Sequence, residues 1–572
     1  MKRKLFGLFL AAFLATIVLG QQPQTVEPEK IDTDMNAKIR KEGLERSKVM
    51  WIEHFLTDVY GPRPTGTPNH EAAAKWAAST MTSWGMKNAH LESWDWGHPG
   101  WLPERATGFI TSPVKANIKF ESAPWTPSTK GTVTGSVFAM KIPEKPSEAE
   151  LTAYLNSVQE KVKGGIVMTT AWQYVRVDFT EPQKRRPDDQ VKAQYGPNGS
   201  AAGGRGSRGG RGGRGNAADA PAADGRLTAQ QITQGVTQFL KDNPPALRLQ
   251  DAARAHGIIV AQNQTGQNYD EAGQYPAALL RNEDYGRIWR ILQDGTPVNV
   301  EFNIVNRYYP EGKTSYNTIA EIPGTDKSDE VVMLGGHLDS WASATGATDN
   351  AIGCAIMMEA VRILESVGAK PRRTIRVALW SGEEEGLLGS QAYVKQHFGT
   401  FEDPKPEFAK FDGYFNVDSG TGRIRGASIF GPPEDADLLR QIMLPFADLG
   451  VAGAIPSKSR RLGGTDSTSF SQAGLPGIGL GQDPIEYFND TWHTNLDTYE
   501  RIIEEDAKKS ATIVAAAVYQ LAMRDDMLPR FTKADMPPKP APEQPGAQPA
   551  ARPAAQAEPA KPSTPATETK QP

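Results

Sequence analysis

Imidazole and carboxylate side chains follow a short apolar run near the middle of the sequence. Residues 331–334 are apolar, a Gly-Gly pair ends the run, and His337 and Asp339 come just after it. Asp349 stands where a long helix-periodic segment begins. A strand, a glycine turn, an imidazole and two carboxylates make half of a metal site. Buried histidines and helix-cap aspartates produce the same local pattern. This stretch alone therefore does not distinguish a metal site from ordinary structural residues.

Further acidic and imidazole side chains come at the ends of other expected strands. They are Glu383, Glu384 and Glu385 after strand 373–381, Asp418 after strand 411–417, and His493 in the loop 491–497. An acidic triplet is usually a solvated face, and an aspartate after a strand is often a helix cap. One shared site explains the repeated placement at strand ends better than several unrelated coincidences.

The chemistry of this set favours divalent metal ions. Two histidines and three carboxylates without sulfur can hold two ions of the zinc type, with one carboxylate bridging them. Two such ions about 3.5–4 Å apart share a water, lower its pKa toward about 7 and polarise a carbonyl. A neighbouring carboxylate then acts as base and passes the proton to a leaving amine. Glu383 and Glu384 can divide these tasks, one binding metal and the other facing the water.

The elements around these residues alternate between strands and helices. Besides strands 373–381 and 411–417, we expect strands at 330–336 and 477–481 and helices at 350–367, 389–397, 434–449 and 504–524, after two N-terminal helices within 34–59 and 67–84. This alternation predicts an α/β domain with a mixed, mostly parallel sheet flanked by helices. Ligands then bind at the carboxyl ends of the strands.

Residues 94–304 have a different character, with short β-rich pieces and frequent Gly and Pro. We expect strands at 132–140, 164–169 and 257–261, in a module set into the α/β domain. The low-complexity stretch 196–226 carries GGRGSRGGRGGRG. Such segments can bind nucleic acid, but this one has no interleaved aromatic residues and the net charge of the chain is −4. We therefore expect a disordered surface loop and no nucleic-acid partner.

The two ends of the chain predict export and disorder. Residues 1–20 combine a Lys/Arg-rich start with an apolar core, which is typical of a cleaved secretory signal. A membrane anchor, the alternative, needs about 20 apolar residues. We expect a periplasmic or extracellular protein that is free of the membrane after cleavage. Cys354 is the only cysteine, so no internal disulfide forms, and residues 526–572 read as a disordered Pro/Ala-rich tail.

Six ordered motifs make the set recognisable. GGHLDS, TDNAIG, WSGEEEGLLGS, NVDSG, GTDSTSF and HTNLDT resemble the co-catalytic dizinc exopeptidases of peptidase clan MH, and within them the plasma glutamate carboxypeptidase (carboxypeptidase Q) group and its bacterial relatives. The resemblance implies a peptidase domain formed by 31–100 and 304–525. It also implies an inserted protease-associated domain at 101–303, with the RGG loop as an addition, and it is compatible with a homodimer.

The same resemblance implies a role for each motif residue. His337 and Asp418 would bind one Zn²⁺, Glu384 and His493 the other, and Asp349 would bridge them; other divalent transition ions suit these ligands as well.

Three further carboxylates receive supporting or catalytic roles from the resemblance. Glu383 would be the general acid/base. Asp339 would orient His337, as carboxylates commonly do for metal-bound imidazole. Asp466 would lie near the substrate and support either the substrate or His493.

The direction of cleavage stays open at this point. Carboxypeptidases and aminopeptidases share this metal centre and differ in the groups that hold a free carboxylate or a free amine. Arg460 and Arg461 could meet a substrate carboxylate, but we favour surface charges. We expect an exopeptidase acting on dipeptides or short peptides, similar to carboxypeptidase Q, with an aminopeptidase as the alternative. A metal-free receptor-like protein is a further alternative, although all five ligand positions and Glu383 are intact.

Overall fold

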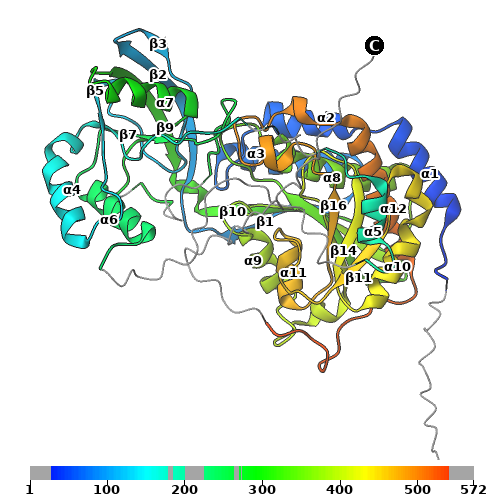
Figure 1. Ribbon diagram of the computed structural model, residues 1–572. Coiled ribbons are helices and arrows are strands. Elements are labelled where there is room, and N and C mark those ends of the chain that lie inside the picture. The colour runs from blue at the N-terminus through cyan, green and yellow to red at the C-terminus, as the bar shows by residue number, and fades with distance from the viewer. Residues whose placement is uncertain are drawn as a thin grey trace, which may run out of the picture.

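The computed structural model describes residues 28–177, 179, 184–199, 225–262, 269–271 and 273–539. The segment 1–20 that we expect to be a signal peptide, most of the RGG stretch and the tail beyond 539 lie outside these residues. Within them the strands form two eight-stranded sheets, and Figure 1 shows the two units side by side. No helix of the described part is long and apolar enough to cross a membrane.

The first sheet forms the core of the larger unit. Its strands, in spatial order, are β1 (Lys87–Asp95), β10 (Thr314–Ile322), β12 (Arg373–Trp380), β11 (Lys327–His337), β13 (Phe411–Asn416), β16 (Gly477–Gln482), β14 (Ile424–Phe430) and β15 (Ala454–Ser457). The four central strands, β12, β11, β13 and β16, run parallel to one another, and the flanking pairs β10–β12 and β16–β14 are antiparallel. The expected mixed, mostly parallel sheet is confirmed.

Helices cover both faces of this sheet. One face carries α1 (Thr33–Glu45), α2 (Val49–His54), α3 (Pro68–Ser83), α8 (Ile352–Ser366), α10 (Pro433–Met443) and α12 (Glu504–Met523), and the other carries α9 (Leu388–His397) and α11 (Ser467–Ala473). Val332 and Leu334 of β11 pack on the face that carries α8 and α12, and Val331 and Met333 pack on the face that carries α9 and α11. This follows because successive side chains of a strand point to opposite faces. Burial on both faces explains why β11 reads as an unbroken apolar run.

Short 3₁₀ and π turns complete the chain path. They are η1 (Phe55–Val59), η2 (Pro310–Lys313), η3 (Ala347–Ala351), η4 (Pro406–Lys410), η5 (Leu444–Leu449), η6 (Tyr487–Thr491) and η7 (Tyr499–Arg501). The turns η3 and η6 lie beside the candidate site, because they carry Asp349 and precede His493.

The second sheet is built from strands that lie between Gly100 and Tyr309. Its order is β3 (Ala116–Asn117), β2 (Gly100–Ser112), β9 (Asn299–Tyr309), β5 (Val133–Ala139), β6 (Ile166–Met168), β7 (Leu247–Asp251), β8 (Ala277–Leu280) and β4 (Phe120–Ser122). The long antiparallel pair β2–β9 carries the chain out of the larger unit and back (Figure 1).

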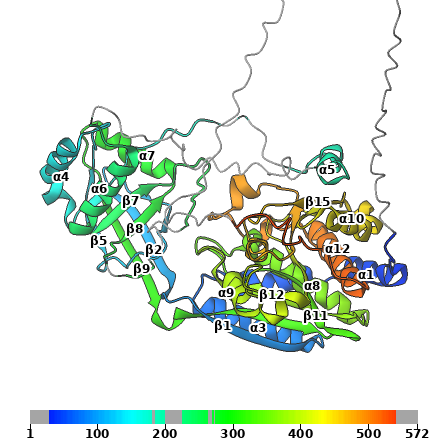
Figure 2. The same cartoon turned by 90° about the horizontal axis from the view of Figure 1, so that it is seen from below.

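This region is less purely β than expected. It also contains α4 (Glu148–Val162), α5 (Asp188–Tyr195), α6 (Ala229–Asp242) and α7 (Asn282–Gln293). The strand expected at 257–261 is wrong, because only Val260 forms an isolated bridge there, to Thr494. In Figure 2, α5 lies over the larger unit, where Val191 and Tyr195 are buried against Ile455.

Part of the stretch 526–572, which we expect to be disordered, packs on the larger unit instead. Leu528 and Phe531 are buried, and Arg530 donates hydrogen bonds to the carbonyl oxygens of Phe408 and Phe411. Residues 528–531 therefore pack on the larger unit, because two apolar side chains and one guanidinium find partners there.

Candidate metal centre

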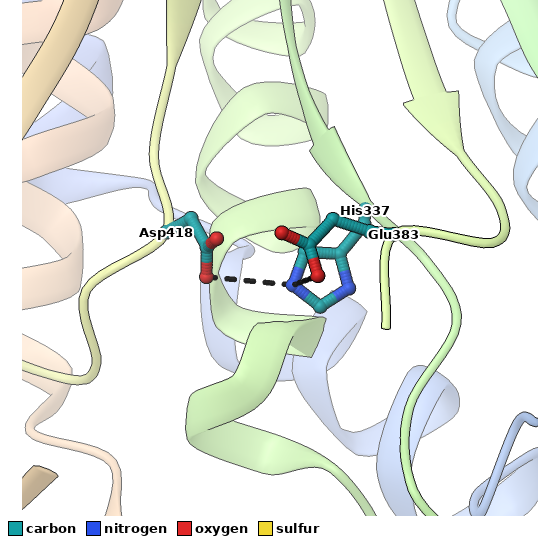
Figure 3. Close-up of side chains that lie close together, drawn as sticks. All are labelled: His337, Glu383 and Asp418. Atoms are coloured by element: carbon teal, nitrogen blue, oxygen red, sulfur yellow. Dashed lines mark ion pairs between the residues drawn. The ribbon is translucent and has the colours of Figure 1, made fainter. Parts of the chain in front are cut away.

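The parallel strands deliver the expected residues to one edge of the first sheet. His337 is the last residue of β11, Glu383 follows β12 and Asp418 follows β13. Figure 3 shows the three side chains pointing toward one another, with the Asp418 carboxylate facing the imidazole. Parallel neighbours end at the same edge, so residues far apart in the chain meet there.

The two histidines lie on either side of Asp349. His337 Nε2 is 3.3 Å from Asp349 Oδ1 and 3.4 Å from Asp418 Oδ1. His493 Nε2 is 3.2 Å from Asp349 Oδ2 and 3.0 Å from Glu384 Oε2. Each oxygen of the Asp349 carboxylate thus faces a different imidazole, which is the arrangement that a carboxylate bridging two ions requires.

Unpaired buried atoms indicate that these groups suit a metal. Four atoms of the cluster are buried without a hydrogen-bond partner: His337 Nε2, Asp349 Oδ2, Glu384 Oε1 and Asp418 Oδ1. A buried polar atom left unpaired costs about 1–3 kcal/mol, and a cation would supply the missing partner. Imidazole nitrogen and carboxylate oxygen are ligands of zinc-type ions.

Two triads among the described residues bring ligand atoms within 4.8 Å of one another. They are His337–Glu383–Asp418 and His337–Asp349–Glu384. The first triad contains Glu383, whose Oε2 is 3.9 Å from His337 Nε2. Geometry alone therefore allows Glu383 to be either a metal ligand or a base beside the ions.

The electrostatics of the cluster are those of carboxylates held close together. Burial raises the pKa of Glu384 to about 7, although the nearby His493 opposes the shift. Burial lowers the pKa of His493, but Glu384 and Asp349 outweigh it and raise that pKa to about 10. In the absence of cations the cluster retains protons, and metal binding would displace them.

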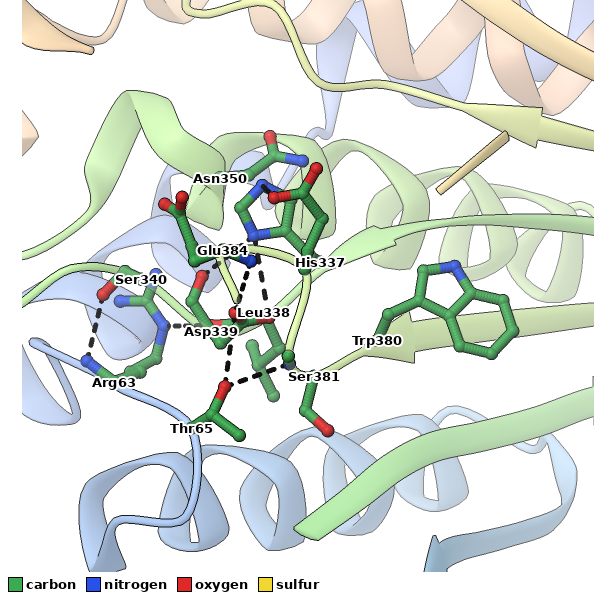
Figure 4. Close-up of polar contacts among 12 residues, drawn as sticks. Arg63, Thr65, His337, Leu338, Asp339, Ser340, Asn350, Trp380, Ser381 and Glu384 are labelled. Carbon is green, nitrogen blue, oxygen red and sulfur yellow. Dashed lines mark hydrogen bonds and ion pairs between the residues drawn. The ribbon is translucent and has the colours of Figure 1, made fainter. Parts of the chain in front are cut away.

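Asp339 supports the site differently from the expected carboxylate–histidine pair. The ring nitrogen His337 Nδ1 hydrogen-bonds the backbone carbonyl of Asp339 at 3.0 Å, whereas its carboxylate Oδ1 lies 3.7 Å away. The other carboxylate oxygen accepts the Glu384 N–H at 3.2 Å. Figure 4 shows the contacts that Asp339 makes between these two loops. Asp339 therefore holds the loop of Glu384 with its side chain and orients His337 with its backbone.

Two further residues that the sequence did not single out hold the loops of the site. Asp497 accepts hydrogen bonds from the backbone N–H groups of Thr348 at 2.5 Å and Asp349 at 3.1 Å. Its position in the HTNLDT motif, four residues after His493, is the sequence signal that could have identified it. Arg63 is fully buried. It donates to the carbonyl oxygens of Leu338 (Figure 4), Leu56, Thr345 and Gly346.

A cavity of ≈ 180 Å³ opens beside the His493 half of the cluster. It is lined by Trp341, Ser343, Ala344, Gly346, Asp349, Glu384, His493, Thr494 and Asp497. No lysine or arginine of the described chain is among these residues. The cavity is therefore lined by carboxylate and imidazole groups, with one indole.

Asp466 and Arg460 lie outside this lining. Asp466 is fully buried, and burial raises its pKa to about 7. Arg460 is buried rather than a surface charge, and its guanidinium pairs with Glu402 at 2.7 Å. Contact of Asp466 with substrate stays a prediction.

Residues 317–518 match peptidase family M28. The match covers less than half of the chain. Carboxypeptidase Q of Mus musculus is 30% identical over 305 residues, which cover 53% of this chain and 62% of that protein. The match thus spans less than two thirds of that relative's length.

Solved structures show the same fold. A peptidase M28 precursor from Shewanella amazonensis superimposes with a TM-score of 0.58 at 24% identity, covering 87% of this chain and 99% of that one. BSAP, a zinc aminopeptidase from Bacillus subtilis, gives 0.50 at 18% identity, with coverages of 84% and 98%. The chain therefore shares the fold of these two solved structures.

Proposed function

We propose that the chain is an exported dizinc exopeptidase that hydrolyses dipeptides or short peptides. The observation that carries this proposal is the Asp349 carboxylate, whose two oxygens face His337 and His493 at 3.3 and 3.2 Å. A carboxylate that bridges two ions turns one oxygen toward each ion, and this placement fits that requirement. The match of residues 317–518 to peptidase family M28 supports the reaction class.

Five side chains would hold the two ions. His337 and Asp418 would bind one, Glu384 and His493 the other, and Asp349 both. Bound ions of this kind activate a water near neutral pH and polarise the scissile carbonyl. Zinc suits the nitrogen and oxygen ligands best, and other divalent transition ions are compatible with them.

Glu383 is the group proposed to move the proton. Its side chain is largely buried and stands within reach of the ligand cluster, 3.9 Å from His337 Nε2. Burial first, and then the neighbouring carboxylates, raise its pKa well above the ordinary value. A carboxylate there takes a proton from the attacking water and delivers it to the leaving amine.

A peptide is the proposed partner, with no role for nucleic acid. The predicted signal segment places the enzyme in the periplasm or outside the cell. The likeness to carboxypeptidase Q favours release of residues from the C-terminal side or cleavage of dipeptides. The aminopeptidase alternative is favoured by one observation: the cavity offers carboxylates and no lysine or arginine, which suits a free amine better than a free carboxylate.

Peptides blocked at one end separate the two directions. The same short peptide would be supplied in four forms, free, N-acetylated, C-amidated and blocked at both ends, and hydrolysis would be measured for each. A carboxypeptidase loses activity on the C-amidated peptide, and an aminopeptidase loses it on the N-acetylated one. Cleavage of the doubly blocked peptide at an internal bond would overturn the exopeptidase proposal.

A further inference from the structure

The second unit contacts the loop that carries His493. The Ala261 N–H donates to the His493 carbonyl at 3.1 Å, and Val260 forms an antiparallel bridge with Thr494. Asn495 makes two further hydrogen bonds between the unit and the loop. Its N–H donates to the Ile259 carbonyl at 3.1 Å, and its Oδ1 accepts the Ile259 N–H at 2.8 Å. Residues 259–261 thus pair with the loop through backbone hydrogen bonds around one isolated bridge.

The backbone of His493 is in a conformation that needs such support. Its φ is 59°, in the left-handed region that side-chain-bearing residues seldom adopt. That region costs roughly 1–2 kcal/mol for an L-residue. The carbonyl of His493 is tied to the second unit on one side, and the bridge at Thr494 ties the next residue. These contacts favour the strained conformation over its alternatives.

The side chain of His493 is also held by the second unit. Its Nδ1–H donates to Gln262 Oε1 at 2.8 Å. The proton on Nδ1 leaves the lone pair on Nε2, which is the atom that faces Asp349 and Glu384. Trp492 stacks on the ring at a centroid distance of 3.8 Å. Stacking fixes the ring plane but does not decide which nitrogen carries the proton.

The two histidines of the site therefore differ in what orients them. His337 Nδ1 uses the carbonyl of Asp339, two residues away in the same loop. His493 uses a side chain that is 231 positions away in sequence. One histidine is oriented from within the larger unit, and the other depends on a contact between the units.

We infer that Gln262 is a positioning residue for His493, so that docking of the second unit sets the affinity of one of the two metal positions. The inference rests on the proposed function, because it takes His493 to be a metal ligand. Loss of a group that orients a metal-bound histidine typically lowers metal affinity or activity about 10–100-fold. The effect should fall on the ion held by His493 and Glu384, and not on the ion held by His337 and Asp418.

The test measures zinc retained by the full chain across buffers of graded free zinc. Gln262→Ala should release one of the two ions at a free-zinc concentration about 10–100-fold higher than the wild type does. The second ion should be released as in the wild type. Gln262→Glu keeps an oxygen acceptor at the same distance along the side chain and should restore wild-type retention.

A matched control separates positioning from general destabilisation. Gln238 lies in the same unit, on α6, and its side-chain amide donates to Asp242 Oδ1 of that helix at 2.9 Å. Gln238→Ala should retain zinc like the wild type. Thermal unfolding of the zinc-free proteins should give the same midpoint for Gln262→Ala and Gln262→Glu.

Two results would overturn the positioning role of Gln262, and a third would overturn the proposed function. Wild-type zinc retention by Gln262→Ala would overturn the positioning role while leaving the dizinc enzyme intact. Equal loss in Gln262→Ala and Gln262→Glu would also overturn it, since the acceptor would not matter. Absence of stoichiometric metal from the wild type would instead overturn the proposed function itself.

Discussion

Replacing Glu383 by glutamine separates the two roles that the geometry allows for this residue. The amide has the same shape as the carboxylate, so the substitution leaves no cavity. It removes the ability to accept and return a proton, and it weakens any bond to a cation. A base beside the ions and a ligand of the ions therefore predict different outcomes for Glu383→Gln.

The expected size of the effect follows from the site. General acid–base groups contribute about 10²–10⁴-fold to turnover, which corresponds to roughly 2.7–5.5 kcal/mol of activation free energy. His337, Asp349, Asp418, Glu384 and His493 remain in place, so both ions should stay bound. We expect kcat to fall by that factor while KM changes little, because substrate contacts are retained.

The assay combines single-peptide kinetics with zinc analysis of the same preparation. Glu385→Gln is the matched control, because the Glu385 carboxyl lies against Thr65, with its Oε2 accepting from Thr65 Oγ1 at 2.8 Å. That variant should lose less than about tenfold in kcat, since neutral hydrogen bonds contribute about 0.5–1.5 kcal/mol. Loss of one ion from Glu383→Gln would make Glu383 a ligand and refute the base assignment. Wild-type turnover would refute both roles.

Three other substitutions probe the bridge, the loops and a buried carboxyl. Asp349→Ala should lower the zinc content of both positions, measured by elemental analysis, because both histidines lose a shared anionic neighbour; undiminished zinc would show that the bridge lies elsewhere. Arg63→Lys should lower the free energy of unfolding by about 2–4 kcal/mol in urea titrations, since a lysine cannot serve all the carbonyl oxygens that Arg63 bonds, and an unchanged midpoint would contradict this. Burial, with Asp412 nearby, raises the pKa of Asp435 from 3.8 to about 9. The folded state thus binds this proton more tightly than the unfolded state does, so Asp435 lowers stability progressively as the pH rises from about 4 to about 9. Asp435→Asn should therefore flatten that dependence and raise stability at pH 7 by up to about 4 kcal/mol, and a parallel pH profile for the two proteins would refute the argument.

The central sheet was readable from sequence because its strands are buried on both faces. Residues 331–334 form an apolar run without alternation, and each such run ends in a polar residue where the strand reaches the site. Parallel neighbours end together, so the meeting of His337, Glu383 and Asp418 followed from local patterns. The motif order then supplied Asp349 and His493.

The second unit was read less well, although part of its signal was present. Ser147 and Glu150 form a capping box at the start of α4, and Thr228 and Gln231 form another at α6. Both are sequence signatures of helix starts, and frequent Gly and Pro between them favoured a β-rich interpretation instead. The short parallel strands β6 and β8 have few residues and carry little periodicity.

Contacts between distant segments left no local pattern at all. Gln262 follows a short apolar run and resembles any polar loop residue, yet it meets His493 across the chain. Arg63 stands in a loop between two prolines, where a buried arginine is unusual. Which residues meet across the two units depends on how the units dock, and a single sequence contains no local pattern that predicts this.

The zinc content of the purified, metal-replete protein tests the central claim most directly. Elemental analysis after dialysis against metal-free buffer should find two zinc or similar divalent ions per chain, with both positions weakened by Asp349→Ala. Retention of no stoichiometric metal by a correctly folded wild-type protein would contradict the dizinc account.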